Sequence, residues 1–175
     1  MGKSTFYDSF LGNIGLRFVN ADVLSLSLQL DPYVAAELAN SIRNQLVDRG
    51  ESFIFETVFS DPTGEKLGFL KKAEAEGYTV VLIFIGVDSP SISDERVSLR
   101  VASGGHDVPH EKVRQRFVRT MENLKRALEG LHNVMVIDHS ELEAGYRVVL
   151  LRKNGKIVWK SRTIPRWLKP LLPKS

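Results

Sequence analysis

The spacing of apolar residues alternates between a strand period and a helix period along the first half of the chain. Residues 17–20 predict a short strand, and residues 52–55 form a compact apolar run that is typical of a strand buried on both faces. Residues 78–85 form the clearest interior strand. Between these runs, apolar residues recur every three or four positions over 35–46 and 67–73, as in helices with one buried face. Three strand-then-helix units therefore follow one another.

Capping signals give these helices their ends. Asp31 followed by Pro32 predicts an N-cap and a first turn, and Gly50 is typical of the position just after a helix. Residues 60–62 predict the start of the next helix, which Gly77 should end.

The second half of the chain predicts two helices, a strand, a hairpin and a tail. We expect a helix with a mixed face at 91–102, a long amphipathic helix at 113–128 and a buried strand at 134–138. Residues 147–160 predict a hairpin that turns at Asn154-Gly155, a pair suited to a type I′ turn. Residues 163–175, with three prolines, are predicted to be a loosely structured tail.

The order of these elements predicts an α/β fold with a mostly parallel sheet and right-handed crossovers. Such sheets bind ligands at the carboxyl ends of their strands. Asp22 and Glu56 fall at such ends and are candidate functional acids. Asp22 has a structural alternative as a helix-cap or turn residue, whereas a charged residue such as Glu56 at the end of an apolar strand is hard to explain structurally. Asp138, at the end of the last parallel strand, is interpreted as a turn residue.

Composition limits the class of protein. The 175 residues are 43% apolar and 26% charged, which fits one globular domain and argues against disorder. Without cysteine there is no disulfide and no thiolate metal site, and no apolar run is long enough to span a membrane. We therefore expect a cytoplasmic protein. The net charge of +3 argues against a dedicated nucleic-acid binder, and the basic residues of the tail are interpreted as a solvated surface.

The first residues carry a candidate phosphate-binding motif. Gly2-Lys3-Ser4-Thr5 matches the end of a P-loop, in which lysine binds the β- and γ-phosphates and the hydroxyl that follows it holds Mg²⁺. The complete motif has a further glycine and four more residues, and it follows a buried strand. The given sequence contains only the second half, so the match alone is weak.

Basic residues around a glycine-rich segment are candidates for binding an anion. Residues 104–109 predict a lid, and the helix after it places Arg114 near the edge of the apolar stripe and Arg116 on its flank. Arg119 should point to solvent. A plain surface role stays open for each of these arginines, as does a loop-supporting role for His106.

Taken in order, several short stretches resemble the zeta-toxin branch of the P-loop kinases. They are GKST at 2–5, FVNAD at 18–22, FETVFSDP at 55–62, GGHDVP at 104–109, RF at 116–117 and NL at 123–124. The resemblance implies a P-loop NTPase fold, a three-layer sandwich around a mostly parallel sheet. It also implies ATP and Mg²⁺, and transfer of the γ-phosphate to a sugar hydroxyl, for which UDP-N-acetylglucosamine is the substrate known for the toxins.

The resemblance implies a role for each candidate residue. Asp22 matches the general base, and Glu56, with Thr57 beside it, matches the acid on the substrate side. The nucleotide would be bound by a set of six residues: Gly2, Lys3, Ser4, Thr5, His106 and Arg114. Arg100 and Arg116 would place positive charge on the transferring phosphoryl group, with Arg116 the first choice. In the zeta toxins an arginine lies near the proline of the lid, and the comparable place here holds His106.

The resemblance also implies a strand before the P-loop, in the middle of the sheet. Without it, two interior strands would lack a shared partner, at a cost of roughly 1–3 kcal/mol for each orphaned buried group. We therefore expect Met1 to be an internal start or a truncation point, and a longer version to fold better and to bind ATP more tightly.

The expected organisation is a kinase-like domain at 1–140, with its lid near 101–116, and a hairpin and basic tail at 141–175 packed on the same domain. Two other functions stay open: a nucleotide-binding protein without catalytic activity, and a nucleic-acid-associated module that uses the tail. The predicted partner is a nucleotide-sugar-like small molecule. An antitoxin protein is a further partner implied by the resemblance.

Overall fold

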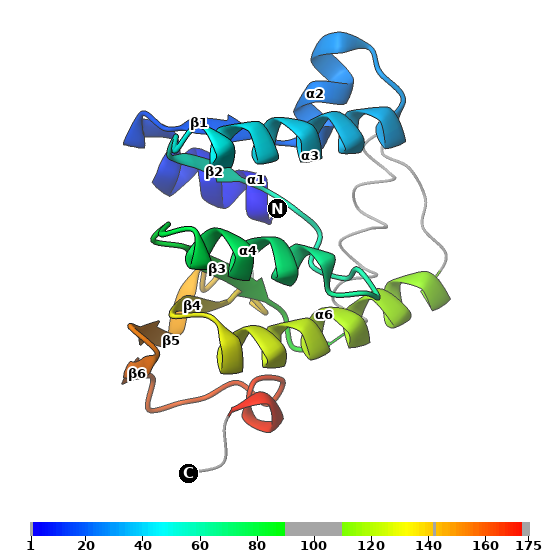
Figure 1. Cartoon of the computed structure of the whole chain (residues 1–175). Coiled ribbons are helices and arrows are strands. Elements are labelled where there is room, and N and C mark those ends of the chain that lie inside the picture. The colour runs from blue at the N-terminus through cyan, green and yellow to red at the C-terminus, as the bar shows by residue number, and fades with distance from the viewer. Residues whose placement is uncertain (1, 90–109, 142, 173–175) are drawn as a thin grey trace. The chain divides into compact units, whose positions relative to one another are not determined.

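The computed structural model describes residues 2–89, 110–141 and 143–172. Two compact units divide the chain, the first ending at Val58 and the second beginning at Phe59. Each unit has its own sheet (Figure 1). The predicted α/β class is confirmed, but the strands of the described residues form a parallel pair and a mixed sheet rather than one sheet.

The first unit is a parallel pair of strands with helical segments packed around it. The chain begins with α1 (Lys3–Phe6), a π-helical segment η1 (Tyr7–Leu11) and a 3₁₀ turn η2 (Gly12–Ile14). Strands β1 (Arg17–Val19) and β2 (Phe53–Phe55) pair in register. Helices α2 (Ala21–Leu28) and α3 (Pro32–Asp48) lie between them in the sequence.

Local signals explain α3. Asp31 is its N-cap and accepts a hydrogen bond from the backbone N–H of Tyr33, as predicted. The helix ends in a Schellman motif: Gly50 has a φ of 68°, and the N–H of Glu51 donates to the carbonyl of Leu46. Its buried face packs on the strands.

The core of the first unit forms where α3 meets β1. Val19, Ala39 and Leu46 are buried there, and Phe53 and Phe55 of β2 pack against them. The prediction that β2 is buried on both faces is wrong, because all three of its residues are only partly buried. The side chains of β2 therefore keep part of their surface exposed to solvent.

The second unit contains a four-stranded sheet in the order β3-β4-β5-β6. Strands β3 (Val81–Gly86) and β4 (Asn133–Asp138) are parallel, while β5 (Arg147–Lys153) and β6 (Lys156–Lys160) form the predicted antiparallel hairpin. Asn154 and Gly155 both have positive φ, at 49° and 76°, which confirms the predicted turn.

Helices α4 (Glu65–Ala75) and α6 (His110–Gly130) belong to the same unit and run side by side (Figure 1). The chain ends in a short 3₁₀ turn, η3 (Lys169–Leu171). The predicted start of α4 at 60–62 is wrong, since the helix begins at Glu65. The side-chain amide of Asn123 on α6 donates to the carbonyls of Phe59 and Asp61, which holds this stretch outside the helix.

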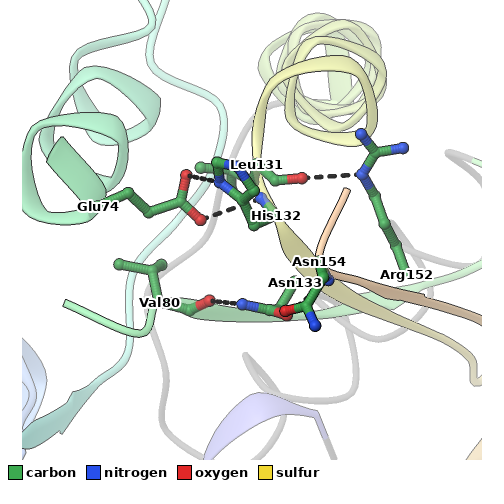
Figure 2. A network of polar contacts seen from close by, with 7 residues as sticks. All are labelled: Glu74, Val80, Leu131, His132, Asn133, Arg152 and Asn154. Carbon is green, nitrogen blue, oxygen red and sulfur yellow. Dashed lines mark hydrogen bonds and ion pairs between the residues drawn. The ribbon is translucent and has the colours of Figure 1, made fainter. Parts of the chain in front are cut away.

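A polar network ties the ends of α4 and α6 to the sheet (Figure 2). Glu74 accepts hydrogen bonds from the backbone N–H of His132 and pairs with its ring Nδ1, both at 3.0 Å. Asn133 donates to the carbonyl of Val80 and accepts from the N–H of Asn154. The start of β4 is thereby joined to β3 and to the hairpin turn.

The helix predicted at 91–102 and the lid segment at 104–109 lie outside the described residues. None of the helices in the described parts of the chain is long and apolar enough to cross a bilayer.

Candidate functional site

The carboxyl ends of β1 and β2 form the starting point of a polar cluster. Val19 pairs with Phe55, so the next residues of the two strands, Asn20 and Glu56, lie side by side. The N–H of Glu56 donates to the carbonyl of Val19 at 3.1 Å, which extends the parallel ladder by one bond. The strand register therefore explains why a carboxylate and an amide meet here.

Glu56 accepts hydrogen bonds from two directions. The Ser4 hydroxyl donates to Glu56 Oε2 at 2.8 Å, and Asn20 Nδ2 donates to the same oxygen at 3.1 Å. Lys3 Nζ lies 3.5 Å from Glu56 Oε1. The carboxylate is thus surrounded by one cation and two donors, with only 14% of its side chain exposed.

An aromatic stack fixes the segment that carries Lys3 and Ser4. The ring of Tyr7 stacks on Phe18 of β1, with centroids 3.7 Å apart and planes 10° from parallel. Because Tyr7 follows α1 directly, this stack holds α1 beside the strand. The two candidate phosphate-binding side chains are therefore placed by packing within the first unit.

Asp22 is the second acid near this cluster. It lies in the first turn of α2, a helix that the sequence analysis did not predict. Its backbone N–H donates to Asn20 Oδ1 at 2.8 Å, and its side chain is exposed. Asn20 is an N-cap residue type, and an acid two residues later suits the first turn of a helix. This pair of signals could have revealed the helix.

The remaining predicted site residues lie in several places. Gly2 precedes α1 and Thr5 lies within it, while Thr57 follows Glu56 and is partly buried. Arg114 and Arg116 are exposed residues of α6 in the second unit. Arg100 and His106 are outside the described residues. The first unit therefore brings together Lys3, Ser4 and Glu56.

Arg116 borders a cavity of about 180 Å³ within the second unit. The cavity lies between the carboxyl end of β3 and α6, and apolar side chains such as Phe84 and Phe117 line it together with Thr120. It offers an apolar recess with a cation at its edge.

Asp138 is buried at the carboxyl end of β4, although the sequence predicted a simple turn residue. Its carboxylate accepts hydrogen bonds from three side chains: Ser140 at 2.6 Å, Arg147 at 2.8 Å and Trp167 at 3.0 Å. Burial alone would raise the pKa of Asp138, but these hydrogen bonds and the charge of Arg147 outweigh it and lower the pKa below its ordinary value.

Trp167 also packs closely on the end of β3. A side chain at Gly86 would meet its ring at 2.3 Å, so glycine is needed at that position. Sequence reasoning missed Trp167, which is 7% exposed, because it lies in a proline-rich segment without any period. The contacts with Asp138 and Gly86 are structural, and they hold the segment after β6 against the sheet.

The fold and the cluster define an α/β protein with a lysine, a hydroxyl and a carboxylate gathered at the carboxyl ends of parallel strands. A family model described as zeta toxin matches residues 21–163, which is well over half of the chain. The chain therefore belongs to the zeta toxin family. Glu56 and Asp22 lie inside the matched range, whereas Lys3 and Ser4 precede it. Searches among curated proteins and among solved structures gave no match.

Proposed function

We propose that this chain is an ATP-dependent kinase that transfers the γ-phosphate to a sugar hydroxyl of a nucleotide-sugar-like molecule, with UDP-N-acetylglucosamine as the first candidate. The observation that carries the proposal is the convergence of Lys3 and Ser4 on Glu56 in a member of the zeta toxin family. The family implies a P-loop fold and typically kinase activity. An antitoxin partner follows from the same family and is likewise a proposal.

The donor set fits the phosphates and the metal ion. Lys3 and Ser4 both point at a carboxylate, so the cluster already holds an anion in reach of a cation and a hydroxyl. ATP supplies the phosphoryl group, and Mg²⁺ neutralises the charge of its phosphates. Lys3 would bind phosphate oxygens, Ser4 would be the protein ligand of the metal ion, and Gly2 and Thr5 would complete the cradle.

Lys3 must exchange Glu56 for phosphate oxygens when the nucleotide binds. The side chain of Lys3 is 47% exposed, so it can turn to a ligand without first leaving a buried position, and the phosphate oxygens replace the carboxylate as its anionic partner. Glu56 also keeps its hydrogen bond from Asn20. Lys3 would thus keep an anionic partner throughout, and Glu56, with Thr57, would then bind the acceptor molecule.

Asp22 would act as the general base. In the reaction the hydroxyl oxygen of the acceptor forms a bond to the γ-phosphorus, the bond between that phosphorus and the β-phosphate oxygen breaks, and the hydroxyl proton passes to Asp22. Arg116 and Arg100 would place positive charge on the moving phosphoryl group, and Arg114 and His106 would bind the nucleotide.

The test is phosphoryl transfer from Mg²⁺-ATP to a panel of UDP-sugars, followed by mass spectrometry. We expect Asp22→Asn to lower kcat at least about 100-fold, the usual contribution of a general base. Asp48→Asn, which changes an exposed acid of the same unit, is the matched control and should leave kcat unchanged. If Asp22→Asn keeps the parent kcat, Asp22 is not the base.

A second candidate is a protein that binds nucleotide without transferring phosphate. The family match covers residues 21–163, so it does not include the two candidate phosphate-binding residues, Lys3 and Ser4. This observation favours the second candidate. ATP binding without any product from the same panel would identify this function.

A further inference from the structure

The side chain of Asn20 uses both ends of its amide inside the candidate site. Oδ1 accepts hydrogen bonds from the backbone N–H groups of Asp22 and Val23, at 2.8 Å and 3.3 Å, and so caps α2. Nδ2 donates to Glu56 Oε2 at 3.1 Å. The residue is only 6% exposed. One rigid group therefore joins the start of the helix that carries Asp22 to the carboxylate of Glu56.

The chemistry of this position requires an amide. Aspartate would cap the helix equally well, because its oxygen accepts the same hydrogen bonds, but it has no donor for Glu56. Serine could cap the helix but is one atom too short to reach Glu56 as well. The strand register places position 20 next to position 56, so the donor and the carboxylate meet without any rearrangement.

We propose that Asn20 is a positioning residue, which sets the distance between the general base Asp22 and the acceptor-binding acid Glu56. This inference rests on the proposed function. Among the described residues, the side chain of Glu56 contacts Lys3, Ser4 and Asn20, and the first two are the ones that would bind phosphate and Mg²⁺. Asn20 then remains the partner that keeps Glu56 in place during the reaction.

The contact itself is tested by a thermal double-mutant cycle that needs no activity. Asn20→Asp keeps the helix cap but sets two carboxylates against each other, so we expect the melting temperature at pH 7 to fall by at least about 3 °C. Combining it with Glu56→Gln reverses the hydrogen bond, because the Gln amide then donates to the new carboxylate. The double variant should recover at least half of that loss. Losses that simply add would overturn the contact.

The positioning role is tested by kinetics on the same variants below their melting temperatures. We expect Asn20→Asp to lower kcat at least about 10-fold while KM for ATP stays within about 2-fold, since a misplaced reacting group lowers the rate more than the binding. Asp31→Ala, which removes the N-cap of α3, is the control for lost stability and should leave kcat within about 2-fold.

The outcomes separate this inference from the proposed function. An active parent whose Asn20→Asp variant keeps its kcat would overturn the positioning role alone. A folded parent that phosphorylates none of the UDP-sugars would refute the proposed function, and an intact thermal coupling would then reduce Asn20 to a structural hydrogen bond, which also overturns the inference.

Discussion

Two carboxylates, Asp138 and Glu56, show how the partners of a side chain decide its role. Asp138 and Glu56 are both carboxylates at the carboxyl ends of strands, yet their partners differ. Asp138 is enclosed by Ser140, Arg147 and Trp167, all of which tie the chain to the sheet. Glu56 is held by Lys3, Ser4 and Asn20, of which Lys3 is half exposed and available to a ligand. The first acid therefore stabilises the fold, and the second belongs to the candidate site.

The lowered pKa of Asp138 gives a pH dependence with a definite sign. A carboxyl whose pKa is lower in the folded state than its ordinary value of 3.8 stabilises the protein fully above that value. This stabilisation is lost as the pH falls through the lowered pKa. We expect Asp138→Asn to lower the free energy of unfolding by about 1–3 kcal/mol at pH 7, measured by urea denaturation.

The same comparison repeated at lower pH completes this test. The difference between the parent and Asp138→Asn should shrink as the pH falls from about 5 to about 2. Glu141→Gln, an exposed acid three positions away, should match the parent throughout. A difference that stays constant over this range would contradict the assigned cause.

At the scale of elements, Asn123 connects α6 to the chain before α4. Its side-chain amide donates to the carbonyls of Phe59 and Asp61, at 3.1 Å and 3.0 Å, and the residue is 2% exposed. Asn123→Asp keeps the shape but removes the donor, so we expect a loss of about 2–4 kcal/mol in the free energy of unfolding. Gln115→Ala, on the exposed face of α6, should stay within about 0.5 kcal/mol of the parent. Equal effects of the two substitutions would show that the amide contributes nothing.

Elements whose signals are local were predicted correctly from the sequence. The caps of α3, the glycine after α4 and the hairpin turn depend on neighbouring residues, and the structure confirms all three. The start of α4 was wrong because Asn123, about sixty residues away, decides it. Helix α2 was missed because its apolar residues, among them Leu26 at 82% exposed, do not follow one buried face.

The candidate site was predictable only in part for the same physical reason. The positions of Asp22 and Glu56 near the ends of strands follow from local pattern. The contacts of Glu56 with Lys3 and Asn20 depend on strand register and on the Tyr7–Phe18 stack, which join distant parts of the sequence. The division of the strands into two sheets is a matter of long-range pairing, which the periods of single strands do not encode.

For the whole molecule, membership of the zeta toxin family and the cluster around Glu56 both support the proposed kinase activity. Lys3 and Ser4 lie in the first unit together with both candidate acids, so the groups proposed to bind phosphate and to receive the proton share one compact unit. Arg116 lies in the second unit, beside an apolar cavity. Lys3, as the proposed ligand of the phosphates, is the residue on which the proposed kinase activity depends most.

Calorimetric titration of the whole chain with Mg²⁺-ATP measures this phosphate binding without depending on the acceptor. We predict saturable binding by the parent, and binding at least about 10-fold weaker for Lys3→Ala, because a charged hydrogen bond to phosphate contributes about 1.5–3 kcal/mol. Lys72→Ala, which removes an exposed lysine of α4, should bind as the parent does. A folded parent that binds no ATP, or a Lys3→Ala variant that binds it equally well, would show that Lys3 does not bind the nucleotide phosphates.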